Sequence, residues 1–131
     1  MVNEFDILGD VYHYLKDSEL AKAVTGQVSK TGRKTDKEDI CISVLSDVPI
    51  SQLQEVFVNV NIYVADLPDE KGAYIENTIR LKELCALALQ TFKVGRGEGF
   101  RISLSTQKTF KVEGANEHFI NNKILYQFCN D

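Results

Sequence analysis

The side chains that could perform covalent chemistry are few and far apart in this sequence. The histidines His13 and His118 lie far from each other, and no serine or cysteine has a base and an orienting acid at a spacing typical of nucleophilic catalysis. The cysteines Cys41, Cys85 and Cys129 are odd in number and widely spaced, which does not indicate a disulfide framework or a zinc site. We therefore expect no enzyme, no cofactor and no metal, although the two histidines could still meet in the fold.

Two short segments invite a phosphate-binding interpretation. The glycines of GRGEG (residues 95–99) leave a predicted helix and enter a predicted strand, whereas a phosphate-binding loop leaves a strand and opens a helix. We interpret Gly95 instead as the C-terminal stop of the helix. The basic segment KTGRKTDK (residues 30–37) has no interleaved aromatic residue for base stacking. It is more typical of a solvated loop or of a contact arm for an acidic neighbour.

Composition narrows the function classes further. The chain has 131 residues, of which 44% are hydrophobic, and this predicts a single domain, residues 1–131, with a flexible basic flap at about 27–39. The net charge of −4 argues against a specific nucleic-acid partner. Apolar runs are much shorter than the ~20 residues of a membrane span, and the start, MVNEFDILGD, does not resemble a signal peptide. We expect a cytoplasmic protein without a membrane partner.

Hydrophobic spacing predicts two main helices. Asn3 is the expected N-cap of the first, and Ser18 caps a short turn after it. The first helix, residues 4–16, has apolar residues at spacings of three and four: Phe5, Leu8, Val11, Tyr12 and Leu15. The second, within residues 67–92, is expected to begin at Asp69 or Gly72, and its apolar stripe includes Ile75, Ile79, Leu81, Leu84, Cys85, Ala88, Leu89 and Phe92.

A period of two predicts strands at 40–46, 55–66, 101–113 and 118–130, and the flap before residue 40 counts as a further strand in the expected order. The last two are expected to form a hairpin through EGANE, with Ile102, Leu104, Phe110 and Val112 on one side of the first. The predicted fold is α+β: a mostly antiparallel sheet with two main helices packed on one face, in the order α-β-β-β-α-β-β.

The strand EVFVNVNIYVAD (residues 55–66) has two different faces. Its valines and Ile62 form a core face, while the other side carries aromatic residues and asparagines. Asparagine is a poor strand residue, so its repetition there indicates either a protein interface or a tolerant outer sheet face. The candidate interface residues, including two from the basic flap, are Phe57, Asn59, Asn61, Tyr63, Asn121, Lys123, Arg33 and Lys34.

The order of these segments resembles that of the tail-terminator or tail-completion proteins of long-tailed bacteriophages, the small head–tail joining components. The resemblance is carried by FDILGDVYHYLKDSELAKAVTGQVSK, ICISVLS, VFVNVNIYVAD, YIENTIRLKELCALALQTF and the closing HFINNKILYQF. It implies a structural protein of a phage or prophage virion, assembled in the host cytoplasm. Such proteins form a ring, commonly a hexamer, that caps the tail tube and joins it to the neck, so the implied partners are its own copies, the tail-tube protein and neck proteins.

A different function is compatible with the same predicted fold. A small cytoplasmic α+β binding module would dimerise through its sheet and use the same strand face. A ring and a dimer differ in the number of copies that associate and in the geometry of their contacts.

Overall fold

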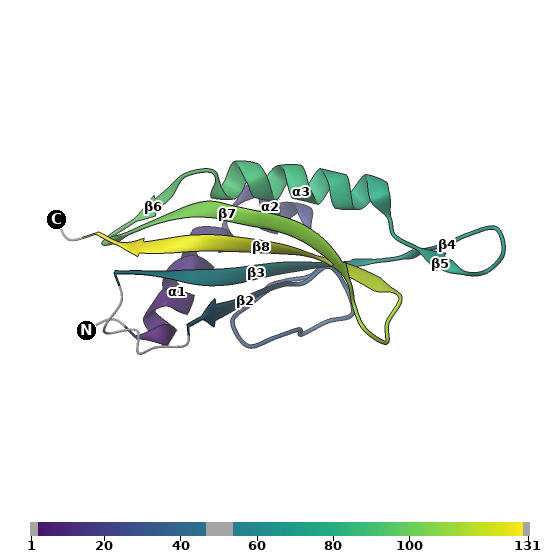
Figure 1. Ribbon diagram of the computed structural model, residues 1–131, viewed down its shortest axis with the longest axis horizontal. Helices are drawn as coiled ribbons and strands as arrows, with labels where there is room; N and C mark the ends of the chain where they lie inside the picture. The colour runs from purple at the N-terminus through teal and green to yellow at the C-terminus, as the bar shows by residue number, and fades with distance from the viewer. Residues whose placement is uncertain (1–2, 47–53, 130–131) are drawn as a thin grey trace.

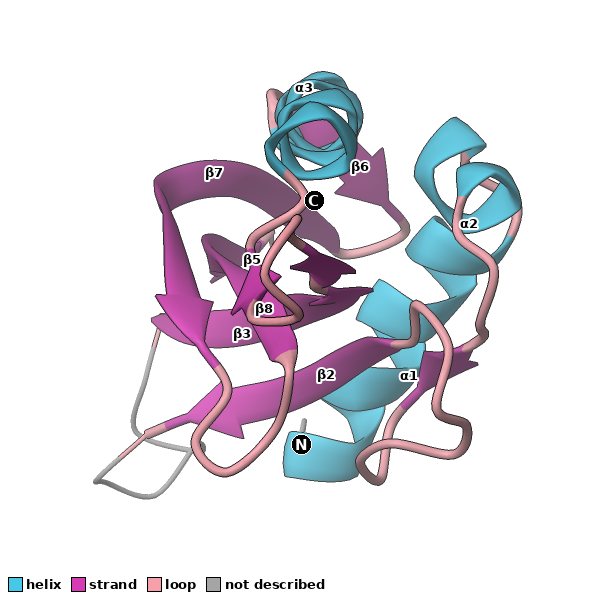
Figure 2. Ribbon diagram, turned by 90° about the vertical axis from the view of Figure 1, so that its right-hand side faces the viewer, coloured by secondary structure: helices cyan, strands magenta, loops and turns pink. Residues whose placement is uncertain are grey.

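The computed structural model describes residues 3–46 and 54–129, which form an α+β fold around a mostly antiparallel, curled sheet (Figures 1 and 2). This is the class that the sequence predicts. The strands β4, β5 and β6 are short elements that the predicted order lacks. The elements are α1 (Glu4–Lys16), α2 (Glu19–Ala23), β1 (Val28–Ser29), β2 (Ile40–Leu45), β3 (Glu55–Ala65), β4 (Leu67–Pro68), β5 (Tyr74–Ile75), α3 (Thr78–Phe92), β6 (Gly95–Gly97), β7 (Phe100–Lys111) and β8 (Glu117–Phe128).

The main sheet has six strands in the order β1-β2-β3-β8-β7-β6. β1 runs parallel to β2, and the other neighbours pair antiparallel. The register sets Asn61 of β3 opposite Cys41 of β2 and Asn121 of β8. Side chains on neighbouring strands that face each other directly lie on the same side of a sheet. We name the side with these three residues the outer face and the opposite side the inner face.

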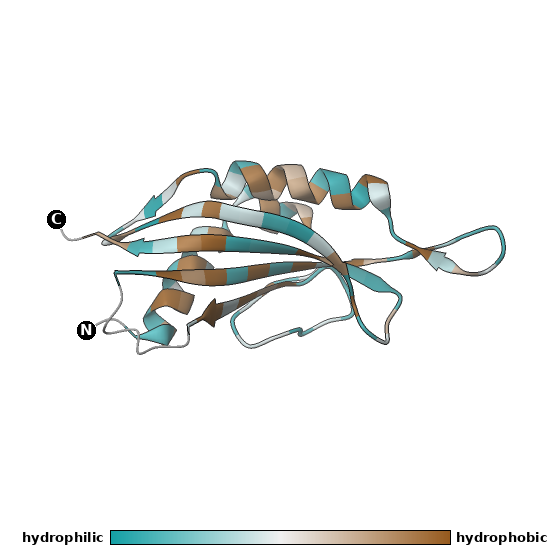
Figure 3. Ribbon diagram, viewed as in Figure 1, coloured by the Kyte–Doolittle hydropathy of each residue, from teal (hydrophilic) through white to brown (hydrophobic). Residues whose placement is uncertain are grey.

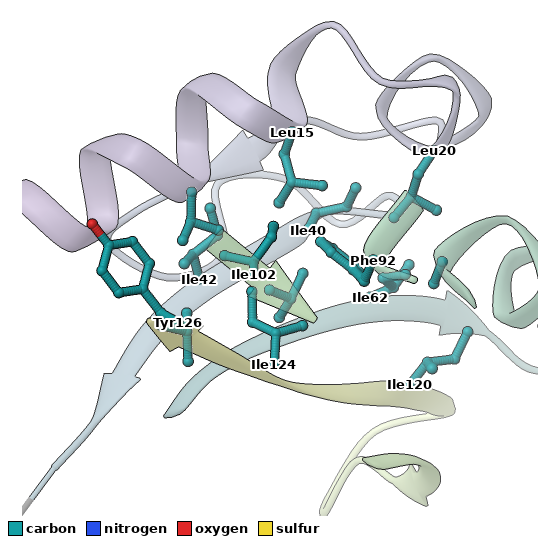
Figure 4. Close-up of a cluster of buried hydrophobic side chains, with 14 of the residues drawn as sticks. Leu15, Leu20, Ile40, Ile42, Ile62, Phe92, Ile102, Ile120, Ile124 and Tyr126 are labelled. Carbon is teal, nitrogen blue, oxygen red and sulfur yellow. The ribbon is translucent and has the colours of Figure 1, made fainter. Parts of the chain in front are cut away.

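The inner face carries the hydrophobic core. Alternate residues of β3 from Val56 to Val64 are buried, as the sequence predicts, and Figure 3 shows the alternation along this strand. They pack with buried side chains of the two longer helices in one cluster (Figure 4). Burial of each large aliphatic side chain contributes about 1.5–3 kcal/mol, so this cluster is the main source of stability. Its helical members are Ile7, Leu8, Val11 and Leu15 from α1, Leu20 from α2, and Leu81, Leu84, Ala88 and Phe92 from α3.

The start of α1 follows the predicted capping, but its buried stripe is rotated. The Asn3 side chain accepts a hydrogen bond from the Asp6 N–H at 3.0 Å, and the Asp6 carboxylate accepts one from the Asn3 N–H at 2.9 Å. This reciprocal capping box satisfies two backbone donors. Phe5, predicted on the apolar stripe, is largely exposed, and Ile7 is buried in its place. Phe5 is thus wrongly predicted as core.

The second helix begins at Thr78, later than the predicted Asp69 or Gly72. Asn77 is its N-cap, with the side chain accepting a hydrogen bond from the Arg80 N–H at 3.2 Å. The residues before it form a small hairpin, in which β4 pairs antiparallel with β5. Gly72 has a φ of +83°, which glycine adopts readily and which a helix does not use. The expected stripe therefore loses its first members, because Ile75 and Ile79 are exposed.

A β-bulge in β7 overturns the predicted face of that strand's second half. Leu104 pairs with Ile124, but the next paired residue is Thr106, opposite Lys123, so Ser105 is an extra residue in β7. Beyond it, Gln107 faces inward opposite Asn122, and Phe110 faces outward opposite Phe119. Phe110, predicted beside Ile102 in the core, is 45% exposed on the outer face.

Gly95 has a different role from the predicted helix stop. It lies in β6, two residues beyond the Lys93 C-cap of α3. A Cβ at this position would lie 2.6 Å from the ring of Tyr14. The Tyr14 hydroxyl donates a hydrogen bond to the Thr91 carbonyl at 2.6 Å, so the glycine lets α1 approach the end of α3 and β6 closely.

The helices of the described residues are all short in relation to a lipid bilayer. Among residues 3–46 and 54–129, none is long and apolar enough to cross one.

Candidate protein interface on the outer face

The outer face gathers most of the predicted interface residues. The register sets Phe57 opposite Leu125, Asn59 opposite Lys123 and Asn61 opposite Asn121, and Tyr63 continues the row. All of these side chains are half-buried. The same face includes further apolar neighbours that the predicted set lacks: Leu45 of β2, Phe110 of β7, and Phe119 and Leu125 of β8.

Three aromatic rings cross the outer face at the end where β8 begins. The ring centroids of Tyr63 and Phe119 lie 5.6 Å apart, and those of Phe119 and Phe110 lie 5.5 Å apart. These separations are typical of favourable aromatic pairs, worth about 0.5–1.5 kcal/mol each. The Arg33 guanidinium lies 4.5 Å from the Tyr63 ring centroid. We name these four side chains the aromatic row.

Asparagines form a hydrogen-bonded cluster beside the aromatic row. The Asn121 side-chain amide donates to Asn61 Oδ1 at 2.7 Å and to Asn59 Oδ1 at 3.1 Å. Each asparagine amide has two N–H donors and a carbonyl acceptor with two lone pairs. The Asn121 amide nitrogen therefore uses its donors within the cluster, and we propose that other amide groups of these half-buried side chains meet the polar groups of a partner.

The far half of the outer face alternates charge with apolar surface. The Lys123 ammonium lies 4.5 Å from the Phe57 ring centroid. Leu45, opposite Phe57 on β2, is exposed. Gln127 accepts a hydrogen bond from Arg101 at 3.3 Å and donates one to Glu55 at 3.2 Å. Cations, amides and apolar groups are thus interleaved over four neighbouring strands.

The basic flap reaches the outer face through Arg33. Its guanidinium donates to the Glu117 carboxylate at 2.6 Å and to the Lys37 carbonyl at 2.7 Å, in addition to its contact with Tyr63. Lys34, the second predicted flap residue, is exposed, and its backbone N–H donates a hydrogen bond to the Asp39 carboxylate at 2.8 Å. The structure therefore joins Arg33, but not Lys34, to the aromatic row.

The flap backbone is held by a buried carboxylate, Asp39, which the hydrophobic pattern of the sequence does not indicate. Asp39 is buried and accepts hydrogen bonds from the N–H groups of Gln27, Lys34 and Thr35 and from the Thr35 hydroxyl, at 2.6–3.1 Å. Burial alone would raise the pKa of Asp39, but these hydrogen bonds outweigh it and lower the pKa to about 2. Thr35 is a local indication of this site in the sequence, because a buried aspartate needs several hydrogen-bond donors nearby.

The two histidines lie in different surroundings. His118 Nδ1 is 2.6 Å from the buried Asp66 carboxylate, whereas His13 is exposed and has an edge contact with the Tyr12 ring. No group of three or more histidine, cysteine, aspartate or glutamate side chains in the described residues is arranged to hold a metal ion.

The arrangement on the outer face offers hydrogen bonds, cation–π contacts and apolar surface to a partner.

Comparison with known proteins does not assign the chain to a family. No family model matches the chain, and a search of curated proteins gives no match.

Proposed function

We propose that this protein is a structural assembly protein that binds other protein chains through its outer face. More specifically, we propose a ring-forming component of a phage or prophage tail, which caps the tail tube and joins it to the neck. The observation that carries the proposal is the outer face itself: aromatic rings, amides and cations interleaved over β2, β3, β8 and β7. The more specific proposal of a tail component is also supported by the resemblance in segment order to tail-terminator proteins.

The chemistry of the outer face fits a protein partner better than water. Tyrosine, phenylalanine and arginine are typical of interface centres, because they combine large contact area with directional groups. In Tyr63, Phe119 and Arg33, the three types lie in direct contact. A face that meets only solvent has no need of half-buried asparagines in mid-strand, where the residue is unfavourable.

The difference in packing between the two faces of the sheet supports the same proposal. The inner face packs with α1 and α3 in one core cluster, and we propose that the outer face is left for assembly. In a ring, one patch of each copy meets a different patch of its neighbour, and further patches can meet the chains above and below. A structural component of this kind needs contact surfaces and no catalytic group.

The direct test changes the outer face without touching the core. We expect Asn61→Lys and Tyr63→Asp to fold normally but to lose assembly, because both put a new charge on the proposed contact surface. Light scattering in solution and co-sedimentation with tail-tube protein measure assembly, and circular dichroism measures folding. Lys82→Glu, at an exposed position of α3, is the matched charge control.

Two results would contradict the proposal. One is a wild-type chain that stays monomeric at high concentration and does not bind tail-tube protein. The other is unfolding of both outer-face variants, which would make the outer face a second core.

A sheet-to-sheet dimer is the second candidate, because the same outer face could meet its own copy around a two-fold axis. In such a dimer the contacts are closed and the mass stops at two copies. Higher assemblies that include more than two copies favour the tail ring. A constant dimer whose melting temperature rises with a small ligand favours the binding module.

A further inference from the structure

The β4–β5 hairpin forms an arm that projects beyond the end of the sheet (Figure 1). We name residues 67–76 the arm. Its apolar side chains Leu67, Tyr74 and Ile75 are each 48–54% exposed, and Ile79 in the first turn of α3 is 76% exposed. A two-stranded hairpin is marginal in water unless its side chains pack on something. Exposed apolar residues on a projecting element are typical of a contact with another chain.

Polar contacts fix the base of the arm to the hairpin of β7 and β8. Asp66, just before the arm, is buried, with its carboxylate 2.6 Å from His118 Nδ1 and 3.9 Å from Lys111 Nζ. Its N–H donates to the Asn116 carbonyl at 2.9 Å. Glu76, the last residue of the arm, has its carboxylate 3.9 Å from His118 Nε2. His118 thus lies between the two legs of the arm.

The tip of the arm is also an organised turn. Asp69 Oδ1 accepts hydrogen bonds from the N–H groups of Lys71 and Ala73, at 2.8 and 2.9 Å. The Asp69 N–H donates to the Ala73 carbonyl at 2.6 Å. The arm therefore has a defined base and a defined tip, which reduces the conformational entropy that binding would cost.

The opposite end of the molecule has complementary features. Figure 1 shows β6 at one end of the long axis and the arm at the other. We name Lys93, Val94, Arg96 and Arg101 the β6 end; all four are exposed, and Val94 is 68% exposed. Residues 93–101 have three basic side chains and one acidic, a net charge of +2. The arm has three acidic side chains and one basic, a net charge of −2.

We propose that the arm of one copy docks on the β6 end of the next copy. The proposal rests on the proposed function, because it names the contact that would join neighbours in the ring. The two surfaces match in two respects: the arm has exposed apolar side chains and the β6 end has one, Val94, and their net charges are opposite. They lie at opposite ends of the same chain, so the contact is heterologous, and repeating it gives a closed ring when the rotation between neighbours allows it.

Charge reversal tests the pairing directly. Glu70 and Arg96 are both exposed and do not belong to the polar contacts of Asp66, Glu76 and His118 at the base of the arm. We expect Glu70→Arg and Arg96→Glu each to weaken self-association about tenfold, since like charges would then meet across the contact. The chain with both reversals should recover most of the loss, and so should an equal mixture of the two single variants. Light scattering over a concentration series, in solution and on tail tubes, measures the association.

A second variant tests the apolar part of the contact. Tyr74→Ser with Ile75→Ser should weaken association at least as much as charge reversal, while the melting temperature stays close to the wild-type value. Phe5→Ser, another exposed apolar position, is the matched control and should leave association unchanged.

The outcomes separate this inference from the proposed function. If the wild type assembles and all the arm and β6-end variants assemble equally well, the docking of the arm is wrong and the proposed function stands. If single reversals weaken association but neither the double variant nor the mixture recovers it, the arm does not meet the β6 end. If the wild type is monomeric in solution and on tail tubes, both proposals are wrong.

Discussion

The two faces of β3 are built on one strand from the same backbone, yet they have opposite designs. The inner face repeats Val and Ile with full burial, and its helices complete the core. The outer face repeats aromatic and amide residues, all half-buried, with cations above two of the rings. Apolar burial is non-directional, whereas hydrogen bonds and cation–π contacts depend on geometry. The inner residues of β3 therefore supply stability, and we propose that the alternate, outer residues of the same strand supply recognition.

The largest effect should come from a charge on the inner face. Val60→Asp buries an unpaired carboxylate among the core side chains, and we expect a loss of more than about 4 kcal/mol, enough to unfold the domain. Denaturation in urea followed by circular dichroism measures it. Asn59→Asp, one residue away on the outer face, should cost much less. Equal losses at the two positions would erase the distinction between the faces.

The next effect concerns Asp39, which anchors the flap near the rim of the sheet. Its folded pKa is lowered to about 2 from the ordinary 3.8, so its contribution to stability is complete above pH 3.8 and is lost as the pH falls toward about 2. Asp39→Asn should cost about 2 kcal/mol at neutral pH, because an amide replaces an acceptor of four hydrogen bonds. It should also flatten the acid limb of the stability curve.

Urea titrations across the acid range measure that limb, with Asp36→Asn, an exposed neighbour, as the control. An unchanged acid limb in the Asp39 variant would show that other carboxylates govern it.

A smaller effect is expected at the polar position of the inner face. Asn122 is buried, donates to the Val60 carbonyl at 3.2 Å and accepts from Gln107 at 2.8 Å. Asn122→Leu should cost about 1–2 kcal/mol, because it removes both hydrogen bonds. Adding Gln107→Leu should cost less than the two single losses together, since the polar pair is then replaced as a unit. Strict additivity in this double-mutant cycle would contradict a coupled pair.

The smallest effect on stability should come from the outer face. Phe110→Ser removes one stacking contact with Phe119 from a side chain that is 45% exposed, and we expect a loss of about 1 kcal/mol. Assembly should nevertheless be lost, because the Phe110 side chain belongs to the proposed contact surface. Thermal unfolding and light scattering on the same samples measure the two properties. Full assembly by this variant would exclude Phe110 from the interface.

Alternation within a strand could be predicted from the sequence, because each residue's face depends only on its neighbours. Val56 to Val64 are buried as expected, and the strands β2, β3 and β8 lie close to their predicted positions. The α1 N-cap at Asn3 was equally accessible, since its partner Asp6 is three residues away. Local hydrogen bonds and local periodicity can be predicted because they involve residues close together in the sequence.

What the sequence did not reveal depends on contacts between distant segments or on competition between local signals. The helical spacing of Ile75 and Ile79 competes with the Asn77 cap and the Asp69 turn, and the cap and turn prevail. The burial of Asp39 depends on donors from both sides of the flap. The contact between Arg33 and Tyr63 could not be predicted without the three-dimensional fold, because the two residues lie on separate elements.

The bulge at Ser105 acts on β7 as an inserted letter acts on a reading frame. Before it, even-numbered residues such as Leu104 point inward; after it, odd-numbered residues such as Gln107 do. Deleting this one serine would leave Gln107 and Phe110 on their present faces in a regular ladder. A strand that kept Ser105 but paired it with Lys123, without the bulge, would instead turn Phe110 toward the core and Gln107 onto the outer face. The aromatic row and the partner of Asn122 would be lost together, so one backbone irregularity ties the composition of the outer surface to the satisfaction of a buried amide.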